Sequence, residues 1–291
     1  MPAMPECQTL RLRYSDGYEA FARLWLPAQP AGGLLYLHGI QSHGGWFERS
    51  AERVARQCDL AVLLPDRRGS GRNDRDRGHA PSAGRLLQDC AECLDELHVR
   101  TGASSFHVLG VSWGGKQALA LRTYAPERVA SLTLVAPGVF PLVDLSLREK
   151  LRVAMCLLAA PRTRFAIPLN DPELFTFDER WQAFIRNDPL KLTHVTARFL
   201  LTSRRLDRYA RAAERDPAGC PLHIFLAGRD RIIDNARTRA FVRQLSWPSR
   251  TITEYPEAAH TLEFESDPEP YLRDLVKWLQ EVSASAVAAK E

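Results

Sequence analysis

The chain has 291 residues, of which 45% are hydrophobic and 25% are charged. These values are typical of globular proteins and exclude a chain that is disordered along its whole length. With 39 basic and 35 acidic residues, the net charge of +4 is too small to indicate nucleic-acid binding, so no nucleic-acid partner is expected.

Short apolar runs alternate with longer amphipathic stretches along most of the chain. This alternation predicts an α/β fold with a mostly parallel, doubly wound sheet that is covered by helices on both faces. The first two runs are separated by a Ser-Asp-Gly turn and are expected to pair as antiparallel strands. The predicted strands are residues 9–14, 19–26, 34–37, 60–64, 106–109, 132–135, 222–226 and 251–255, and helices are predicted at about 47–58, 82–99, 114–125, 235–245 and 272–279.

The strand–helix alternation stops between residues 139 and 215. This segment is rich in arginine, looks helical between its prolines, and is too long for a simple connection. We therefore predict a helical cap at 139–215, inserted into a catalytic domain formed by 1–138 and 216–291. The apolar cap residues are expected either to line a pocket or to form the core of the cap itself: Leu151, Met155, Leu157 and Leu158.

The small positive charge is concentrated in this predicted cap. From Arg148 to Arg215 the chain has 14 basic and 8 acidic residues, an excess of six, so the remainder carries a net charge of −2. Such a segment is often an ordinary solvated surface. The alternative interpretation is a transient contact between the cap and an anionic membrane surface.

The six cysteines are scattered along the chain and do not form a disulfide framework, which favours a reducing, cytoplasmic location. No apolar run approaches the roughly 20 residues that a membrane-spanning helix needs, and the first residues do not resemble a secretory signal. Cys90 and Cys93 have C-x-x-C spacing but no second pair, so they are interpreted as buried thiols. We expect neither a metal nor a cofactor.

Residues 110–114 read Gly-Val-Ser-Trp-Gly and fit the motif G-x-S-x-G between a strand and a helix. A sharp turn of this kind holds the serine in a strained conformation at a helix N-terminus, and the flanking glycines avoid collisions with nearby backbone. Ser112 is therefore the candidate nucleophile. The same segment nearly matches a phosphate-binding loop ending at Lys116, but Gln117 stands where a hydroxyl would ligate magnesium, so an NTPase is only a distant alternative.

A serine nucleophile in such a fold needs an acid and then a histidine later in the chain. Asp230 lies just beyond a predicted strand, at the edge of the sheet where ligands bind, whereas Asp234 is expected to cap the next helix. His260 lies in the loop before the last helix and is the candidate general base. The backbone N–H groups of Ile40 and Trp113 are the candidate oxyanion donors.

Five segments together resemble the α/β-hydrolase family, and within it the monoacylglycerol lipase and lysophospholipase-like branch. The resemblance covers nearly the whole chain outside the cap and implies a serine hydrolase that cleaves carboxylic esters with lipid-like acyl chains. It implies the nucleophile, acid, base and oxyanion donors named above. The segments are LLYLHGIQSHGGWF, LLPDRRGSGRN with Asp66, Arg68, Gly69 and Gly71, VLGVSWGGKQALA, LAGRDRIID and EAAHTLEFE.

The chain also departs from this branch at the predicted site. The branch often has His and Met on either side of the nucleophile, where this chain has Val111 and Trp113, and Gln41-Ser42-His43 replaces a common Glu-His-Ser. A thioesterase or an esterase for small acyl groups, using the same three residues, is therefore an alternative.

Overall fold

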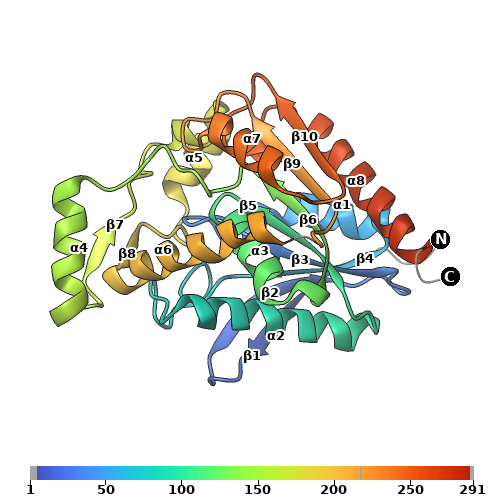
Figure 1. Ribbon diagram of the computed structural model, residues 1–291, viewed down its shortest axis with the longest axis horizontal. Helices are drawn as coiled ribbons and strands as arrows, with labels where there is room; N and C mark the ends of the chain where they lie inside the picture. Colours follow the sequence, from blue (N-terminus) through green and yellow to red (C-terminus); the bar gives the residue numbers. More distant parts are fainter. Residues whose placement is uncertain (1–4, 217, 289–291) are drawn as a thin grey trace.

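The computed structural model describes residues 5–216 and 218–288. Its centre is an eight-stranded sheet in the order β1-β2-β4-β3-β5-β6-β9-β10 (Figure 1). Strand β2 pairs antiparallel with both β1 and β4, and the other neighbours pair in parallel. The strands are β1 (Cys7–Arg13), β2 (Glu19–Trp25), β3 (Gly32–Leu37), β4 (Leu60–Pro65), β5 (Phe106–Val111), β6 (Val129–Val135), β9 (Leu222–Ala227) and β10 (Arg250–Tyr255).

The sheet confirms the predicted fold class and each of the eight expected strands. Strands β4, β5 and β9 are buried at every position, which is why each appears in the sequence as a short, nearly continuous apolar run. The predicted helices are also present: α1 (Glu48–Cys58), α2 (Ala83–Thr101), α3 (Trp113–Tyr124), α7 (Asn235–Gln244) and α8 (Glu269–Ala288).

Helices cover both faces of this sheet. Helix α3 packs against β5 and β6, and α2 packs beside it against β3 and β4. Helices α1 and α8 pack against each other on the opposite face, where the indole of Trp278 in α8 donates a hydrogen bond to the Thr133 hydroxyl of β6 at 2.9 Å. Because the parallel strands run in the same direction, their C-terminal ends lie at one edge of the sheet, where ligands bind in folds of this kind.

The described residues between β6 and β9 form three α-helices, two short 3-10 helices and a small two-stranded sheet. The α-helices and strands are α4 (Leu147–Ala159), β7 (Arg164–Ala166), α5 (Glu179–Asn187), β8 (His194–Thr196) and α6 (Ala197–Ala212). The helices agree with the sequence-based expectation, whereas the pair β7–β8 was not predicted. Each of its strands has only three residues, too few to show an alternating pattern.

This inserted segment is joined to the sheet at several places. Asp188 accepts a hydrogen bond from the Trp46 indole at 2.8 Å and lies 3.1 Å from the Nε2 atom of His43. The backbone N–H of Leu192 donates to the Gln41 carbonyl at 2.9 Å. Helix α6 lies along α3, while α4 and β7 extend beyond the end of the sheet (Figure 1). The insertion thus has an anchored part and a protruding part.

Candidate active site

Ser112 lies in a sharp turn between β5 and α3. Its backbone has φ +52° and ψ −120°, a strained combination for a residue other than glycine. A Cβ atom on Gly110 would collide with the backbone of Gly114 and Gly115, and one on Gly114 would collide with the end of β3. These glycines are therefore required by the close packing of backbone around the turn, as expected from the motif.

Asp230 and His260 are brought together although 30 residues separate them in the chain. The Nδ1 atom of His260 lies 2.7 Å from the Oδ2 atom of Asp230, and both side chains are almost fully buried. The other carboxylate oxygen of Asp230 accepts the backbone N–H groups of Ile232 and Ile233 at 2.7 and 2.9 Å. A carboxylate held in this way fixes the orientation of the imidazole ring.

The competing carboxylate has a different role. The Oδ1 atom of Asp234 accepts the backbone N–H of Arg237 at 2.9 Å and caps α7. Its interpretation as a helix cap is therefore confirmed.

The second nitrogen of His260 remains available for chemistry. Its Nε2 atom is buried and has no hydrogen-bond partner among the described residues. The ring of Phe175 packs edge-on against the imidazole, with centroids 6.0 Å apart. Three strands end at the same edge of the sheet, and the site residues follow them: Ser112 after β5, Asp230 after β9 and His260 in the loop after β10. Within the described part of the chain, no hydrogen bond joins Ser112 to His260. Catalytic hydrogen bonds of this type are often formed only when substrate binds.

Ile40 and Trp113 belong to two segments that meet at the serine turn, where a Cβ atom on Gly39 would lie 3.4 Å from the Cβ atom of Ser112. Ile40 follows the end of β3, and Trp113 is the first residue of α3. Within residues 5–216 and 218–288 neither backbone N–H donates to a protein acceptor. Two such N–H groups beside a nucleophile, one of them at a helix N-terminus, can stabilise an oxyanion.

Arg67 connects the two predicted oxyanion donors and was missed in the sequence. Its guanidinium donates to the carbonyls of Gly39 and Ile40, each at 3.0 Å, and its Cζ atom lies 4.6 Å from the centroid of the Trp113 ring. The side chain is buried. A forked donor over an aromatic face is an arrangement that arginine can make and lysine cannot. Arg67 therefore fixes both the Ile40 loop and the Trp113 side chain.

The arrangement around Lys116 argues against a phosphate-binding loop. Its ammonium group lies 2.6 Å from the Asp207 carboxylate and 3.2 Å from the Ser203 hydroxyl, both in α6. Burial lowers the pKa of Lys116, and the Asp207 charge opposes that shift. The Nε1 atom of Trp113 also donates to Ser203, at 2.9 Å. Lys116 thus joins α3 to α6 instead of facing the Gly-rich turn, and the NTPase interpretation is not supported.

Glu263 is a buried carboxyl group three residues after His260. One of its oxygens accepts the backbone N–H of Ser50 at 2.8 Å, and the other has no partner among the described residues. Burial raises the pKa of Glu263 to about 7. The loop that carries His260 continues directly into Glu263. The charge state of Glu263 is therefore expected to affect the stability of the segment that holds His260.

No cluster of three or more potential metal ligands occurs among the residues that the structure describes. Cys90 and Cys93 lie on the buried face of α2, where Cys93 contacts the Tyr14 hydroxyl and Cys90 contacts the Gln117 amide. Burial raises the pKa of both thiols. This agrees with their interpretation as structural thiols.

The apolar residues of the predicted cap require a correction. Leu157 lines a cavity beneath α4, but Leu151, Met155 and Leu158 are 61%, 64% and 91% exposed. These three side chains lie outside the lining of that cavity and outside the hydrophobic core. Helix α4 has apolar residues on two faces, and the face with Leu151, Met155 and Leu158 is exposed. The periodicity of a sequence does not by itself tell which apolar face of a helix is buried.

A family model and several known proteins are similar to this chain. The family model Hydrolase_4, described as serine aminopeptidase, S33, matches residues 28–267. Human monoglyceride lipase is 22% identical over 280 residues, covering 94% of this chain and 91% of that protein. The crystal structure of a monoacylglycerol lipase from Paleococcus ferrophilus superposes with a TM-score of 0.81 at 19% identity, over 91% of this chain and 100% of the other.

A thermostable carboxyl esterase from Bacillus coagulans, solved with glycerol, gives a TM-score of 0.76 at 16% identity, over 95% of this chain and 99% of the other. These superpositions confirm the predicted fold class at the level of overall architecture.

Proposed function

Because the chain belongs to the Hydrolase_4 family of α/β-hydrolases, we propose that it is a serine hydrolase that cleaves carboxylic esters with lipid-like acyl chains. Its relatives include proteins named as monoglyceride lipase and carboxyl esterase, which favours an ester over other acyl substrates. The observation that carries the proposal is the buried Asp230–His260 pair, whose free Nε2 atom accompanies a strained serine at the same sheet edge.

In the proposed reaction His260 takes the proton of Ser112 as the hydroxyl oxygen attacks the ester carbonyl. Asp230 holds the Nδ1–H and stabilises the imidazolium that forms. The oxyanion rests on the N–H groups of Ile40 and Trp113, each worth about 3–4 kcal/mol in comparable acyl-transfer sites. The imidazolium then protonates the departing alcohol, and a water activated by His260 releases the acid and restores Ser112.

A thioesterase remains the second candidate, because the same three residues would serve it.

The test combines a covalent probe with ester hydrolysis. A fluorophosphonate should label the wild-type protein, and Ser112→Ala should abolish both the label and the hydrolysis of p-nitrophenyl esters. His260→Ala should weaken both the labelling and the hydrolysis. The control is His223→Ala, which changes a buried histidine in β9. Its labelling and hydrolysis, each divided by the amount of folded protein, should equal those of the wild type. Hydrolysis that survives in Ser112→Ala would contradict the assignment. Rates across esters and thioesters of increasing chain length then separate lipid-like substrates from small ones.

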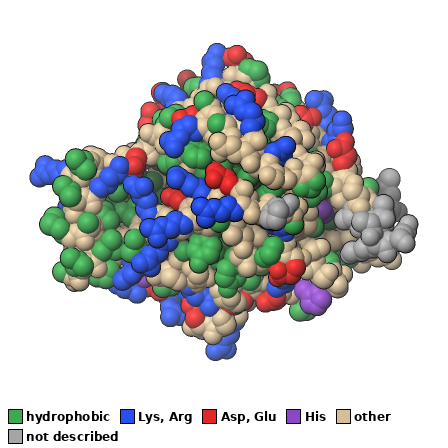
Figure 2. Space-filling model, viewed as in Figure 1, with side chains coloured by type: hydrophobic (Ala, Val, Ile, Leu, Met, Phe, Trp, Pro, Cys, Tyr) green, Lys and Arg blue, Asp and Glu red, His purple; other side chains and the backbone are tan. Residues whose placement is uncertain are grey.

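We also propose that the inserted segment contacts anionic membrane surfaces. The outward stripe of α4 has Leu147, Leu151, Met155 and Leu158 at 61–91% exposure. Figure 2 shows hydrophobic side chains gathered at the end of the molecule where Figure 1 places α4, with basic side chains beside them. Exposed leucines flanked by arginines are typical of helices that lie in a membrane interface.

Vesicle sedimentation tests this contact. Binding should increase with the fraction of anionic lipid, decrease with salt, and fall in the double variant Leu151→Ser and Leu158→Ser. The matched control is Val99→Ser, an equally exposed apolar residue on α2, far from α4. Binding that ignores both lipid charge and salt would contradict the proposal. The structure shows no helix, within its described range, that is long and apolar enough to cross a membrane.

All six cysteines are free thiols. Free and largely buried thiols are common in reducing compartments, and this supports our proposal of a cytoplasmic location.

A further inference from the structure

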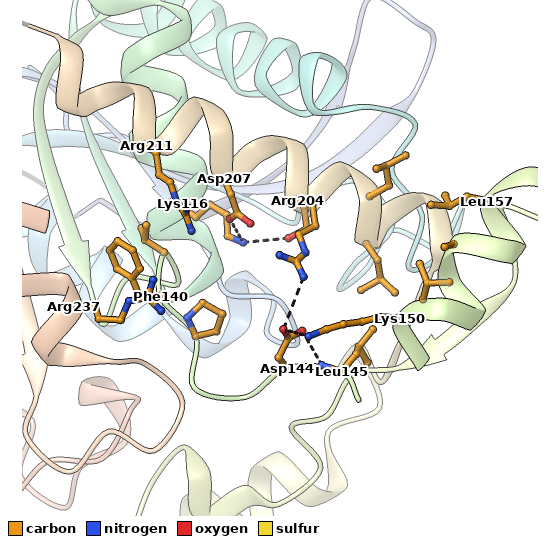
Figure 3. Close-up of a pocket in the computed structure, with 17 residues that line it drawn as sticks. Lys116, Phe140, Asp144, Leu145, Lys150, Leu157, Arg204, Asp207, Arg211 and Arg237 are labelled. Atoms are coloured by element: carbon orange, nitrogen blue, oxygen red, sulfur yellow. Dashed lines mark hydrogen bonds and ion pairs between the residues drawn. The ribbon is translucent and has the colours of Figure 1, made fainter. Parts of the chain in front are cut away.

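A cavity of about 570 Å³ lies between α4, α6 and the segment that follows β6 (Figure 3). This volume falls within the usual range of small-molecule sites. Its lining includes neither Ser112 nor His260, although Lys116 on its wall is one helical turn beyond Ser112 in α3. The cavity is therefore next to the candidate active site and separate from its reacting groups.

One end of the cavity is basic. The guanidinium groups of Arg211 in α6 and Arg237 in α7 lie 5.6 and 4.8 Å from the ring centroid of Phe140, and Lys116 lies at the same end (Figure 3). Two elements that are distant in sequence thus bring cationic side chains to one aromatic ring.

The carboxylates around the cavity do not neutralise these arginines. Asp207 pairs with Lys116 at 2.6 Å, and Asp144 lies 2.6 Å from Lys150 and 3.9 Å from Arg204. No carboxylate among the described residues forms an ion pair with Arg211 or Arg237. Two positive charges therefore face this end of the cavity without an acidic partner.

The other end of the cavity holds most of its aliphatic side chains, next to the paired charges of Asp144 and Lys150 (Figure 3). It lies beneath α4, where Leu157 and Leu145 are drawn at the side away from Arg237 (Figure 3). Val153 of α4 is buried against the same wall and packs with Phe165 and Ala197. The cavity therefore offers unpaired positive charge at one end, and aliphatic side chains beside an already paired Asp144 and Lys150 at the other.

We propose that this cavity binds a single-chain amphiphile with an anionic head, such as an alkyl carboxylate or an alkyl phosphate. The head group would lie between Arg211 and Arg237, because the planar guanidinium pairs with carboxylate and phosphate oxygens through two parallel hydrogen bonds. The alkyl chain would extend along Leu145 and Leu157 beneath α4, where its burial is favourable. The site goes beyond the proposed ester hydrolysis, since occupancy requires no reaction at Ser112.

Isothermal titration of the wild-type protein with ten-carbon probes tests the head-group preference. Decanoate and decyl phosphate should bind saturably, whereas decanol and decyltrimethylammonium should bind about tenfold more weakly or worse, because they lack the charged hydrogen bonds. Tighter binding of decanoate identifies a free fatty acid as the ligand, and tighter binding of decyl phosphate identifies a phosphorylated lipid head. Equal binding of the cationic and anionic probes would overturn the proposal.

Variants locate the site. The double variant Arg211→Gln and Arg237→Gln should weaken decanoate binding about tenfold or more, while Arg243→Gln, an exposed arginine on α7 outside the cavity, should not. Leu157→Ser should weaken the binding of decanoate without affecting the binding of acetate. Unchanged decanoate binding in the folded double variant would overturn the assignment. Hydrolysis of p-nitrophenyl acetate, measured in parallel, should be unaffected by the arginine changes, so a failure of this site is distinguishable from a failure of the catalytic proposal.

Discussion

The edge of the sheet that carries Ser112 and the outer face of α4 differ in what fixes their side chains. At the sheet edge, close backbone packing restricts the glycines beside Ser112, and a buried hydrogen bond orients His260. The guanidinium group of Arg67 stacks on the ring of Trp113. On α4 the apolar side chains of Leu151, Met155 and Leu158 face outward with more than half their surface exposed. At the sheet edge, contacts within the protein fix the side chains. The exposed apolar side chains of α4 have no such contacts, and their proposed role depends on a membrane surface. Substitutions in the two regions should therefore differ in kind as well as in size.

The largest effect is expected at the acid of the sheet edge. Asp230→Asn should lower kcat/KM about a thousandfold to ten-thousandfold, because an amide favours the wrong tautomer of His260. Asp234→Asn is the matched control, since asparagine caps a helix as well as aspartate does. Steady-state hydrolysis of a p-nitrophenyl ester measures both. Equal activity of the two variants would remove Asp230 from the proposed mechanism.

The next effect concerns stability near His260. The pKa of Glu263 is raised from 4.5 to about 7 by burial, so the folded state favours the protonated form. Its contribution to stability is complete below about pH 4.5 and is lost as the pH rises through 7, a change of roughly 3 kcal/mol. Glu263→Gln should remove this loss.

Urea unfolding across this pH range compares Glu263→Gln with Glu257→Gln, which changes an exposed carboxylate in the same loop. Parallel stability curves for wild type and Glu263→Gln would show that Glu263 titrates normally.

Arg67 should affect the rate more than binding. Arg67→Met removes the donors to the Gly39 and Ile40 carbonyls and should lower kcat about tenfold to a hundredfold, with little change in KM, because misplaced oxyanion donors weaken only the transition state. Arg67→Lys should not restore the rate, since lysine lacks the fork. Arg75→Met, on the exposed part of the same loop, is the control. A rise in KM at constant kcat would indicate a role in substrate binding instead.

The smallest effect is expected on α4. Leu158→Ala should change the free energy of unfolding by less than about 0.5 kcal/mol, because the side chain is 91% exposed. The same change at Leu119, fully buried in α3, should cost about 2–5 kcal/mol. Denaturant titration measures both. A large cost at Leu158 would mean that the outer face of α4 is covered by another part of the protein.

The sheet was predictable because buried parallel strands leave short apolar runs that end at turns. Asp230 lies just after such a run, β9, whereas His260 lies in the loop that follows β10, an alternating and partly exposed strand. The glycines at 110 and 114 were informative because backbone packing permits no side chain there.

Other features depend on contacts between distant segments. Arg67 lies in a loop with several other arginines, among them Arg68, which pairs with Asp89, and nothing local distinguishes Arg67 from the others. The basic end of the cavity needs Arg211 and Arg237, which come from different elements and meet only in the folded chain. For α4 we predicted from the sequence that Leu151, Met155 and Leu158 are covered, whereas these side chains face outward. Sequence periodicity indicates that a helix has an apolar face, but which face is buried depends on its contacts with other parts of the folded chain.

The bonds between α6 and α3 have a consequence for protein engineering. Ser203 and Asp207 hold Trp113 and Lys116, so the last helix of the insertion is tied to the helix that begins at the serine turn. A chimaera that exchanges the insertion for that of another hydrolase should be spliced after β8, keeping α6 with its host. Splicing after α6 would leave the Lys116 ammonium buried without a counter-charge, and buried charges left unpaired typically cost about 3–5 kcal/mol.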